Sequence, residues 1–335
     1  MANITGSVLT LGETMGLIAS VQTGSFAHVG QANIGIGGAE SNVAVGLARL
    51  NIPVVWVGKV GPDSLGKRVI REIRGEGVDV RGRLDAHAST GLMLKEFTRP
   101  GLSRITYYRS GSAGSRISAS DIDPDLVENS SLVHLTGITP LLSETARQTC
   151  LEVVRRARAA GVRVSVDINY RASIAEETVA SRVIGELVRQ ADLVFGSAEE
   201  FALVASDLGL AYHAGSDEAD EPASQVRLRD SLREASGGVE YVVKQGDDGA
   251  STFRRGEVFS VPGHDVEVVD TVGAGDAFVA GYLSGDVQGW TVEQKLKRAN
   301  ACGALMCTNS GDWEASATLS DLAEFLDAEA DPVRR

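Results

Sequence analysis

The chain has 335 residues, of which 43% are hydrophobic and 23% are charged, a composition that excludes a disordered protein and suffices for one large core or two domains. Its formal net charge of -13 argues against nucleic acid as a partner, because phosphate backbones bind clustered basic surfaces. The sequence has neither a secretory leader nor a run of about 18 apolar residues, so we expect a cytoplasmic protein with no membrane segment.

Short runs of apolar and β-branched residues alternate with segments of helical period along the chain. The predicted strands cover residues 7–12, 53–61, 131–137, 162–169, 191–196 and 239–246, and the predicted helices include 39–50, 64–77 and 144–161. Uninterrupted apolar strands are typical of parallel sheets that are covered on both faces. We therefore predict an α/β fold with a central, mostly parallel sheet flanked by helices.

Two segments interrupt this alternation. Residues 13–36 are polar and contain several glycines, and residues 90–108 read as a hairpin around Pro100 and Gly101. We predict that both segments leave the main sheet and form a small sheet that covers a site. The expected lid comprises about residues 13–36 and 90–109, and the whole chain, 1–335, is expected to be a single domain.

The stretch DTVGAGDAF, residues 270–278, places small residues where an extended segment turns into a helix. Free backbone N–H groups at a helix start attract anions, and Gly273, Ala274 and Gly275 would let a phosphate approach the backbone closely. Asp276 follows this turn and would repel phosphate, unless it takes the proton of a hydroxyl group that lies between them. These residues alone leave open whether Asp276 is such a base or merely caps the helix.

Here the chain resembles a known family. DTVGAGDAFVAGYLSG (270–285) is similar to the carboxy-terminal signature of the PfkB, or ribokinase-like, sugar kinases, and GGAESNVAVGLARL (37–50) to their amino-terminal signature. The resemblance extends from Leu11 to about Leu322. It implies a ribokinase-like, doubly wound sheet with a small β-sheet lid. It also implies a phosphotransferase that uses ATP and Mg²⁺ with an alcohol group as acceptor, and it leaves open a monovalent cation and a homo-oligomer.

The family's residue roles can be carried over where the motifs match. Asp276 then corresponds to the catalytic base, and Gly273, Ala274 and Gly275 form the anion hole. By the same resemblance, the diglycine of the lid hinge and the sugar site is Gly37 and Gly38, with Asn42 close behind.

The resemblance also indicates a nucleotide site. The loop KQGDDG (244–249), with Lys244, Gly246 and Gly249, is similar to the loop that borders the nucleotide, and we assign Asn169 to the same site. SAEE (197–200) stands where the family usually has NxxE, a motif tied to magnesium and phosphate. Because Ser197 replaces the asparagine, we expect Glu200 to act on the metal, and only indirectly.

Aromatic and basic residues indicate the acceptor. Tyr107, Tyr108 and Arg109 end the second lid segment, and Arg171 follows a strand of the body. Two arginines that converge on one pocket favour a carboxylate ligand. The residues also leave open that Arg109 pairs with a surface acid and that Arg171 neutralises a nucleotide phosphate.

Three segments resemble those of 2-keto-3-deoxygluconate kinases within the family: YYRSGSA (107–113), DINYR (167–171) and GDWEASATL (311–319). In those enzymes the tyrosines and arginines hold a keto acid, and the aspartate matching Asp312 reaches the sugar. We therefore predict a sugar-acid kinase that converts 2-keto-3-deoxygluconate at O6 into 2-keto-3-deoxy-6-phosphogluconate. Met93 replaces a tyrosine expected in some relatives, which leaves the galactonate epimer open. The residues are also compatible with a fructokinase, a ribokinase, a 5-dehydro-2-deoxygluconokinase or a sugar-binding regulator without turnover.

Overall fold

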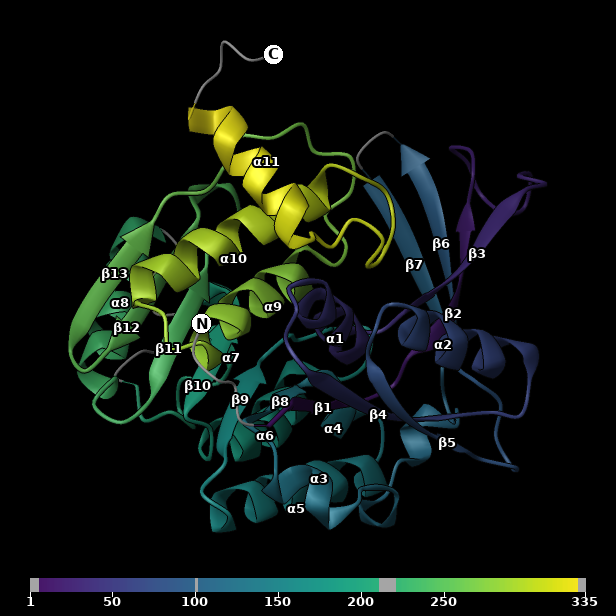
Figure 1. The fold of residues 1–335 in the computed structure, drawn as a ribbon, viewed down its shortest axis with the longest axis horizontal. Helices are drawn as coiled ribbons and strands as arrows, with labels where there is room; N and C mark the ends of the chain where they lie inside the picture. The colour runs from purple at the N-terminus through teal and green to yellow at the C-terminus, as the bar shows by residue number, and fades with distance from the viewer. Residues whose placement is uncertain (1–5, 100–101, 211–220, 331–335) are drawn as a thin grey trace.

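A computed structural model describes residues 6–99, 102–210 and 221–330 of the chain. Within these residues the strands form a nine-stranded sheet and a separate four-stranded sheet (Figure 1). The strands of the main sheet, in spatial order, are β13 (Glu257–Val261), β12 (Ala250–Arg254), β11 (Glu240–Lys244), β10 (Leu193–Gly196), β9 (Arg163–Asp167), β8 (Leu132–Thr136), β1 (Val8–Leu11), β4 (Val54–Val60) and β5 (Asp79–Leu84).

The main sheet is parallel from β11 to β5, and only the pairs β11–β12 and β12–β13 are antiparallel. Strands β1, β8 and β10 are buried along their whole length, as the uninterrupted apolar runs of the sequence predict. The expected α/β architecture is confirmed. Strand β5 and the β12–β13 hairpin were not expected from the sequence.

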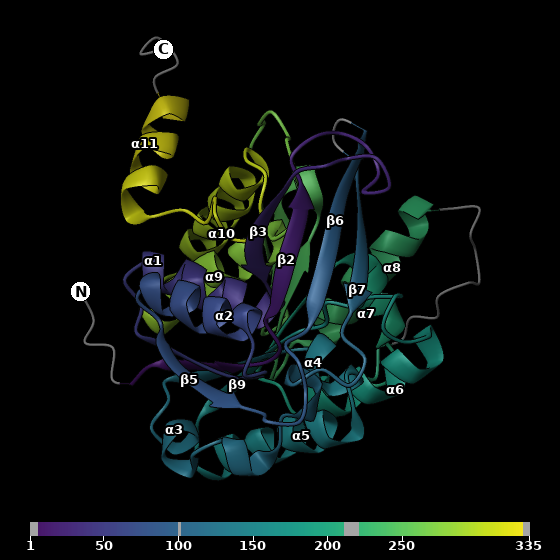
Figure 2. The same cartoon turned by 90° about the vertical axis from the view of Figure 1, so that its right-hand side faces the viewer.

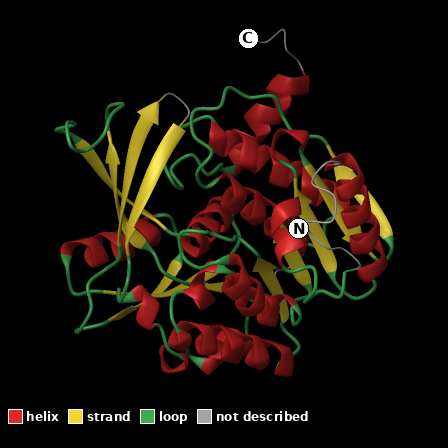
Figure 3. Ribbon diagram, turned by 180° about the vertical axis from the view of Figure 1, so that it is seen from behind, coloured by secondary structure: helices red, strands yellow, loops and turns green. Residues whose placement is uncertain are grey.

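Helices cover both faces of the main sheet (Figures 1 and 3). The core on one face contains buried residues of α1 (Ala39–Arg49), α2 (Ser64–Gly75), α9 (Ala274–Val287), α10 (Val292–Cys307) and α11 (Leu319–Ala330). The core on the other face contains residues of α3 (Pro124–Glu128), α4 (Ile138–Leu141), α5 (Glu144–Ala159), α6 (Glu177–Val188), α7 (Ala198–Leu203) and α8 (Glu221–Ala235). None of the helices in these described ranges is long and apolar enough to cross a membrane.

The small sheet consists of β3 (Ala32–Gly37), β2 (Met15–Ser20), β6 (Leu92–Arg99) and β7 (Leu102–Tyr108), in that order. These strands come from the two segments that interrupt the alternation of the sequence. Strands β6 and β7 pair antiparallel, although the turn predicted at Pro100 and Gly101 lies outside the described residues. Figure 2 shows the four strands side by side, rising from the edge of the α/β body.

The topology of the main sheet indicates where a ligand would bind. Strand β1 pairs with β4 on one side and with β8 on the other. The chain therefore adds strands first on one side of β1 and later on its other side, so the strand order reverses at β1. In open parallel sheets, ligands bind beyond the carboxyl ends of the strands at such a point. Glu13 follows β1 and Ile138 follows β8, and both lie at this end of the sheet.

Candidate active site

A cavity of about 740 Å³ lies between the carboxyl edge of the main sheet and the small sheet. Its walls combine loops that follow five parallel strands with side chains of the small sheet, among them Met93 and Tyr107. Most residues singled out in the sequence line this cavity: Gly37, Gly38, Asn42, Tyr107, Arg109, Asn169, Arg171, Ser197, Glu200, Lys244, Gly246, Gly273, Gly275, Asp276 and Asp312.

A second cavity, of about 750 Å³, adjoins the first. It contains two further residues of the sequence analysis, Gly249 and Ala274, and it shares Lys244, Gly246, Thr271 and Gly275 with the first cavity. The glycine turn at the start of α9 therefore separates two compartments that communicate. Ligands in the two compartments would approach each other beside this turn and the end of β11, which supply the shared residues.

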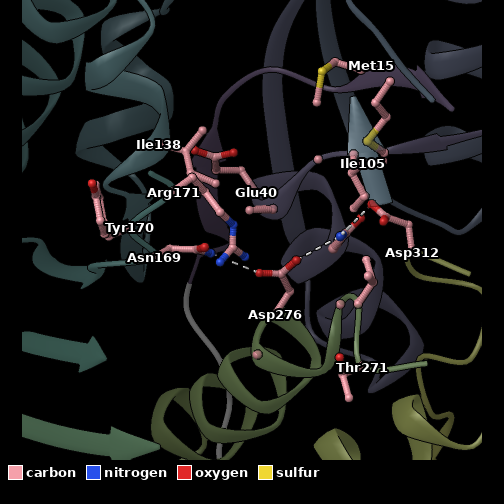
Figure 4. A pocket seen from close by; sticks show the side chains of 18 of the residues that line it. Met15, Glu40, Ile105, Ile138, Asn169, Tyr170, Arg171, Thr271, Asp276 and Asp312 are labelled. Carbon is pink, nitrogen blue, oxygen red and sulfur yellow. Dashed lines mark hydrogen bonds between the residues drawn. The ribbon is translucent and has the colours of Figure 1, made fainter. Parts of the chain in front are cut away.

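Asp276 lies in the first turn of α9 and points into the first cavity (Figure 4). Its Oδ2 accepts a hydrogen bond from Nδ2 of Asn42 at 2.8 Å, and its Oδ1 accepts one from Nδ2 of Asn169 at 3.3 Å. The N-cap of α9 is Gly273, which makes no side-chain capping bond. Asp276 therefore does not cap the helix, and this interpretation of the sequence is excluded.

The environment of Asp276 suits proton transfer. Burial raises the pKa of this carboxyl group from 3.8 to about 7, against the opposing effects of the Asn42 hydrogen bond and the Arg171 charge. The neighbouring carboxylates Asp167 and Asp312 raise it further. A pKa near neutrality is what a general base needs at physiological pH.

The turn that precedes Asp276 requires glycine at its first position. Gly273 has φ 78°, in the left-handed region that L-residues avoid, and a Cβ there would meet the backbone carbonyl of Asp312. The ammonium group of Lys244 lies close to Gly275. The backbone N–H groups of Gly273 and Gly275 and this ammonium group lie where the two cavities meet, a combination that suits an anion.

The two arginines of the sequence analysis differ in their surroundings. Arg109 pairs with Glu13, whose Oε2 lies 2.7 Å from Nη2 and 2.8 Å from Nε of the guanidinium. This acid is buried, whereas the sequence suggested pairing with an acid on the surface. Arg171 makes no ion pair within the described residues, so it is the arginine whose charge is available in the cavity.

Tyr107 and Tyr108 point to opposite faces of β7, as successive strand residues do. Tyr107 lines the cavity, and burial raises the pKa of its hydroxyl group, which therefore remains protonated and can donate a hydrogen bond. Tyr108 is 59% exposed and lines neither cavity. The structure therefore does not support the predicted substrate contact of Tyr108.

Three residues that the sequence analysis assigns to the nucleotide or its metal, Ser197, Glu200 and Lys244, form a connected polar group at the wall of the first cavity. Nζ of Lys244 lies 2.8 Å from Oδ1 of Asp167 and 3.9 Å from Oε2 of Glu200. Ser197 and Glu200 form a capping box at the start of α7, and the second carboxylate oxygen of Glu200 accepts from the backbone N–H of Tyr170 at 2.9 Å. These bonds orient Glu200 toward the cavity. The described residues contain no cluster of three or more His, Cys, Asp and Glu that would hold a metal ion by itself.

Sequence reasoning did not assign Glu13 or Asp167 to the site. Glu13 follows the first strand and pairs with a residue 96 positions away, and no local pattern signals such a pair. Asp167 ends β9 two residues before the assigned Asn169, and its position at a strand end was the available signal.

Comparisons with known proteins agree with this geometry. Residues 5–318 match the family described as pfkB family carbohydrate kinase. The chain is 33% identical to the 2-dehydro-3-deoxygluconokinase of Bacillus subtilis (strain 168), over 96% of this chain and 95% of that one. It is 30% identical to the 2-dehydro-3-deoxygalactonokinase of Haloferax volcanii, over 92% of this chain and 93% of that one.

Among solved structures, a putative ribokinase II from E. coli in complex with ATP and Mg²⁺ superposes with a TM-score of 0.84. It is 25% identical, and the match covers 96% of this chain and 99% of that chain. The signature segments, the two communicating cavities and a family match over nearly the whole length lead to one conclusion. The chain belongs to the PfkB family of carbohydrate kinases.

Proposed function

We propose that this PfkB kinase transfers the γ-phosphoryl group of ATP to O6 of 2-keto-3-deoxygluconate, also called 2-dehydro-3-deoxygluconate. The position of Asp276 carries the proposal for the reaction, because this carboxyl group lies in one cavity directly behind the anion-binding turn that leads to the other. The sugar acid occupies the first cavity and the nucleotide the second.

In the proposed reaction, the carboxylate of Asp276 takes the proton of the acceptor hydroxyl group as its oxygen attacks the γ-phosphorus. The new O6–phosphorus bond forms while the bond between the γ-phosphorus and the β,γ-bridging oxygen breaks, and ADP leaves. Asn42 and Asn169 hold the carboxylate in place through their hydrogen bonds. The N–H groups of Gly273, Ala274 and Gly275 stabilise the charge on the phosphoryl oxygens.

Mg²⁺ bound with the nucleotide neutralises phosphate charge. The chain offers Glu200, whose carboxylate lies at the cavity wall beside Lys244, and this donor fits an indirect role in which water links it to the ion. The small sheet forms one wall of the first cavity, and we propose that it acts as a lid that excludes water, with Gly37 and Gly38 at its hinge.

The acceptor assignment depends on Arg171. Because Glu13 already neutralises Arg109, Arg171 is the group that we expect to bind the carboxylate of the substrate. The hydroxyl group of Tyr107 can donate a hydrogen bond to the same substrate carboxylate. Asn42 donates to Asp312 at 3.3 Å, and we expect Asp312 to contact the hydroxyl groups of the sugar. A neutral sugar would leave Arg171 without a partner.

A second candidate substrate is the C4 epimer, 2-keto-3-deoxygalactonate. Met93 is buried at 3% exposure in the cavity wall, and its side chain offers no strong hydrogen-bonding group to distinguish the two orientations of a hydroxyl group. A relative with 30% identity carries the corresponding kinase name.

A substrate panel tests the assignment. ADP release would be measured with both keto-deoxy acids, 5-dehydro-2-deoxygluconate, fructose and ribose, for the wild type and for Arg171→Met. We expect kcat/KM to be highest for a keto-deoxy acid, and Arg171→Met to raise the KM for that acid by about 100-fold, since a bidentate charged contact is lost.

The neutral sugars are the internal control, because their KM should not change in Arg171→Met. A wild-type preference for fructose or ribose would contradict the sugar-acid assignment and leave only the family activity. Absence of turnover with every sugar, together with intact sugar binding, would support the alternative of a sugar-binding regulator without catalytic activity.

A further inference from the structure

A buried lysine connects the small sheet to the α/β body. Lys95 lies on β6, on the same face as Met93, and its side chain is 1% exposed. Its ammonium group forms an ion pair with Asp270, whose side chain is 5% exposed. Asp270 comes three residues before Gly273, where the anion-binding turn begins. Neither Lys95 nor Asp270 has a role in the proposed phosphoryl transfer.

The Lys95 ammonium group lies where three segments of the chain meet. Besides Asp270, it contacts the backbone carbonyl of Gly311 at 3.4 Å. The other carboxylate oxygen of Asp270 accepts a hydrogen bond from the backbone N–H of Val272 at 3.2 Å, within the turn itself. Gly311 precedes Asp312, whose carbonyl packs against Gly273. One ammonium group thus joins β6, the anion-binding turn and the segment that carries Asp312.

The surroundings of this ammonium group are mainly acidic. Asp270, Asp312 and Glu314 act on this region from the body, and on β6 itself the ring of Phe97 lies 5.5 Å from Nζ of Lys95. Burial raises the pKa of Asp312 to about 6, and the charge of Lys95 opposes that rise. A nucleotide phosphate would add negative charge beside these carboxylates. A fixed positive charge is therefore needed close to the turn.

We propose that Lys95 is a positioning residue whose ammonium group serves as a tethered cation for the anion hole. Through Asp270 and Gly311 it fixes the turn at Gly273, and it does so only when the small sheet lies against the body. Lid closure and the geometry of the phosphate site are thereby linked. The kinase then needs no monovalent cation from solution at this position. This inference rests on phosphoryl transfer and not on the identity of the sugar.

Two variants of Lys95 test the proposal, each assayed with ATP and the sugar that the wild type turns over fastest. Lys95→Ala leaves a cavity beside Asp270, whereas Lys95→Met fills it without a charge. We expect kcat to fall by about 100-fold in both variants, because the turn is misplaced, with a smaller change in the KM for the sugar. Ammonium or methylammonium chloride at constant ionic strength should restore kcat at least about tenfold in Lys95→Ala but not in Lys95→Met.

Lys295 provides a matched control. Its side chain is 2% exposed and pairs with Glu240 at 2.6 Å and with Asp286 at 3.0 Å, at the amino-terminal end of β11 and away from both cavities. Lys295→Met should lower Tm and leave kcat within about twofold of the wild type. A purely structural role for Lys95 would give this same result, with no rescue by ammonium.

Three outcomes would overturn the proposal. The first is a kcat within about threefold of the wild type in Lys95→Ala or Lys95→Met. The second is a loss of rate that ammonium does not relieve in a folded Lys95→Ala variant.

The third outcome needs no variant. It is a fall in wild-type activity when potassium and ammonium are replaced by tetramethylammonium at constant ionic strength. If Lys95→Ala does not fold, Lys95→Met and this wild-type measurement decide. Failure of the keto acid as substrate would leave all these tests valid.

Discussion

The proposed chemistry depends on Asp276, and replacement of this residue gives a direct prediction. Asp276→Asn keeps the shape of the side chain but cannot accept the hydroxyl proton. We expect kcat to fall by about 1000-fold, the usual contribution of a general base, with ATP affinity changed by less than about threefold. Steady-state kinetics and calorimetric titration with ATP would measure both. A variant that retains a tenth of the wild-type kcat would show that Asp276 is not the base.

The pH dependence of the reaction is a second property of this residue. The base must be ionised, so kcat/KM should rise with pH through about 7, the pKa to which burial raises Asp276, and level off above it. Asn42 donates to the carboxylate at 2.8 Å and so favours its charged form. Asn42→Ala should therefore shift this limb to higher pH by about one unit, the equivalent of one charged hydrogen bond. An unshifted limb would assign the titration to another group.

The sequence predicted individual residues unevenly. Asp276 and the turn before it could be found because they are adjacent and because glycines before an acid at a helix start are unusual. Glu13 could not be assigned, since its role depends on the approach of Arg109 from the small sheet. The sequence analysis assigned both Tyr107 and Tyr108 to the substrate, but only Tyr107 lines the cavity. Which of two successive strand residues faces the cavity depends on the register of β7 with β6.

Helix α9 is the element that places the proposed anion hole. Gly273 and Gly289 flank it, with φ 78° and 73°, so both positions favour glycine by about 1–2 kcal/mol. A Cβ at Gly273 would also meet the carbonyl of Asp312, whereas nothing lies within 4 Å of a Cβ at Gly289. The same substitution at the two ends of one helix therefore separates backbone strain from displacement of the turn.

We expect Gly273→Ala to lower kcat by about 100-fold and to weaken ATP binding, because the turn must move away from Asp312. Gly289→Ala should lower Tm through backbone strain alone, and therefore by less than Gly273→Ala, with kcat unchanged. Kinetics and thermal unfolding of both variants provide the comparison. If the two variants had equal kcat, the turn at Gly273 would not be part of the phosphate site.

At the level of elements, the long apolar strands and amphipathic helices were predictable, because their periodicity is a local property of the sequence. Strand β5 was not, since most of its residues are exposed and it reads as DVRGRL, without an apolar run. The small sheet was inferred only as an interruption of the pattern. Its strand order, with β2 between β3 and β6, pairs segments that lie far apart in the chain, and no local signal encodes this order.

The burial of Asp276 lowers the free energy of unfolding of the whole molecule, and the size of this effect depends on pH. The pKa of this carboxyl group is 3.8 in the reference state and about 7 in the folded chain. Between these values the folded chain holds a proton that the unfolded chain has released. Stability contributed by this group is therefore complete below about pH 4 and is lost as pH rises through about 7.

Asp276→Asn cannot titrate, so it isolates this contribution from that of every other group. We expect the variant to gain stability relative to the wild type by roughly 2 kcal/mol between about pH 5 and pH 8, since each pKa unit corresponds to about 1.4 kcal/mol. Urea unfolding of both proteins at the two pH values measures the difference. The part of the Asn42 and Asn169 hydrogen bonds that does not depend on pH cancels in the comparison, and the part that does is already contained in the folded-state pKa of about 7. A difference that stays constant or decreases with pH would mean that Asp276 is ionised throughout this range, and the raised pKa on which its role as a base near neutral pH depends would be wrong.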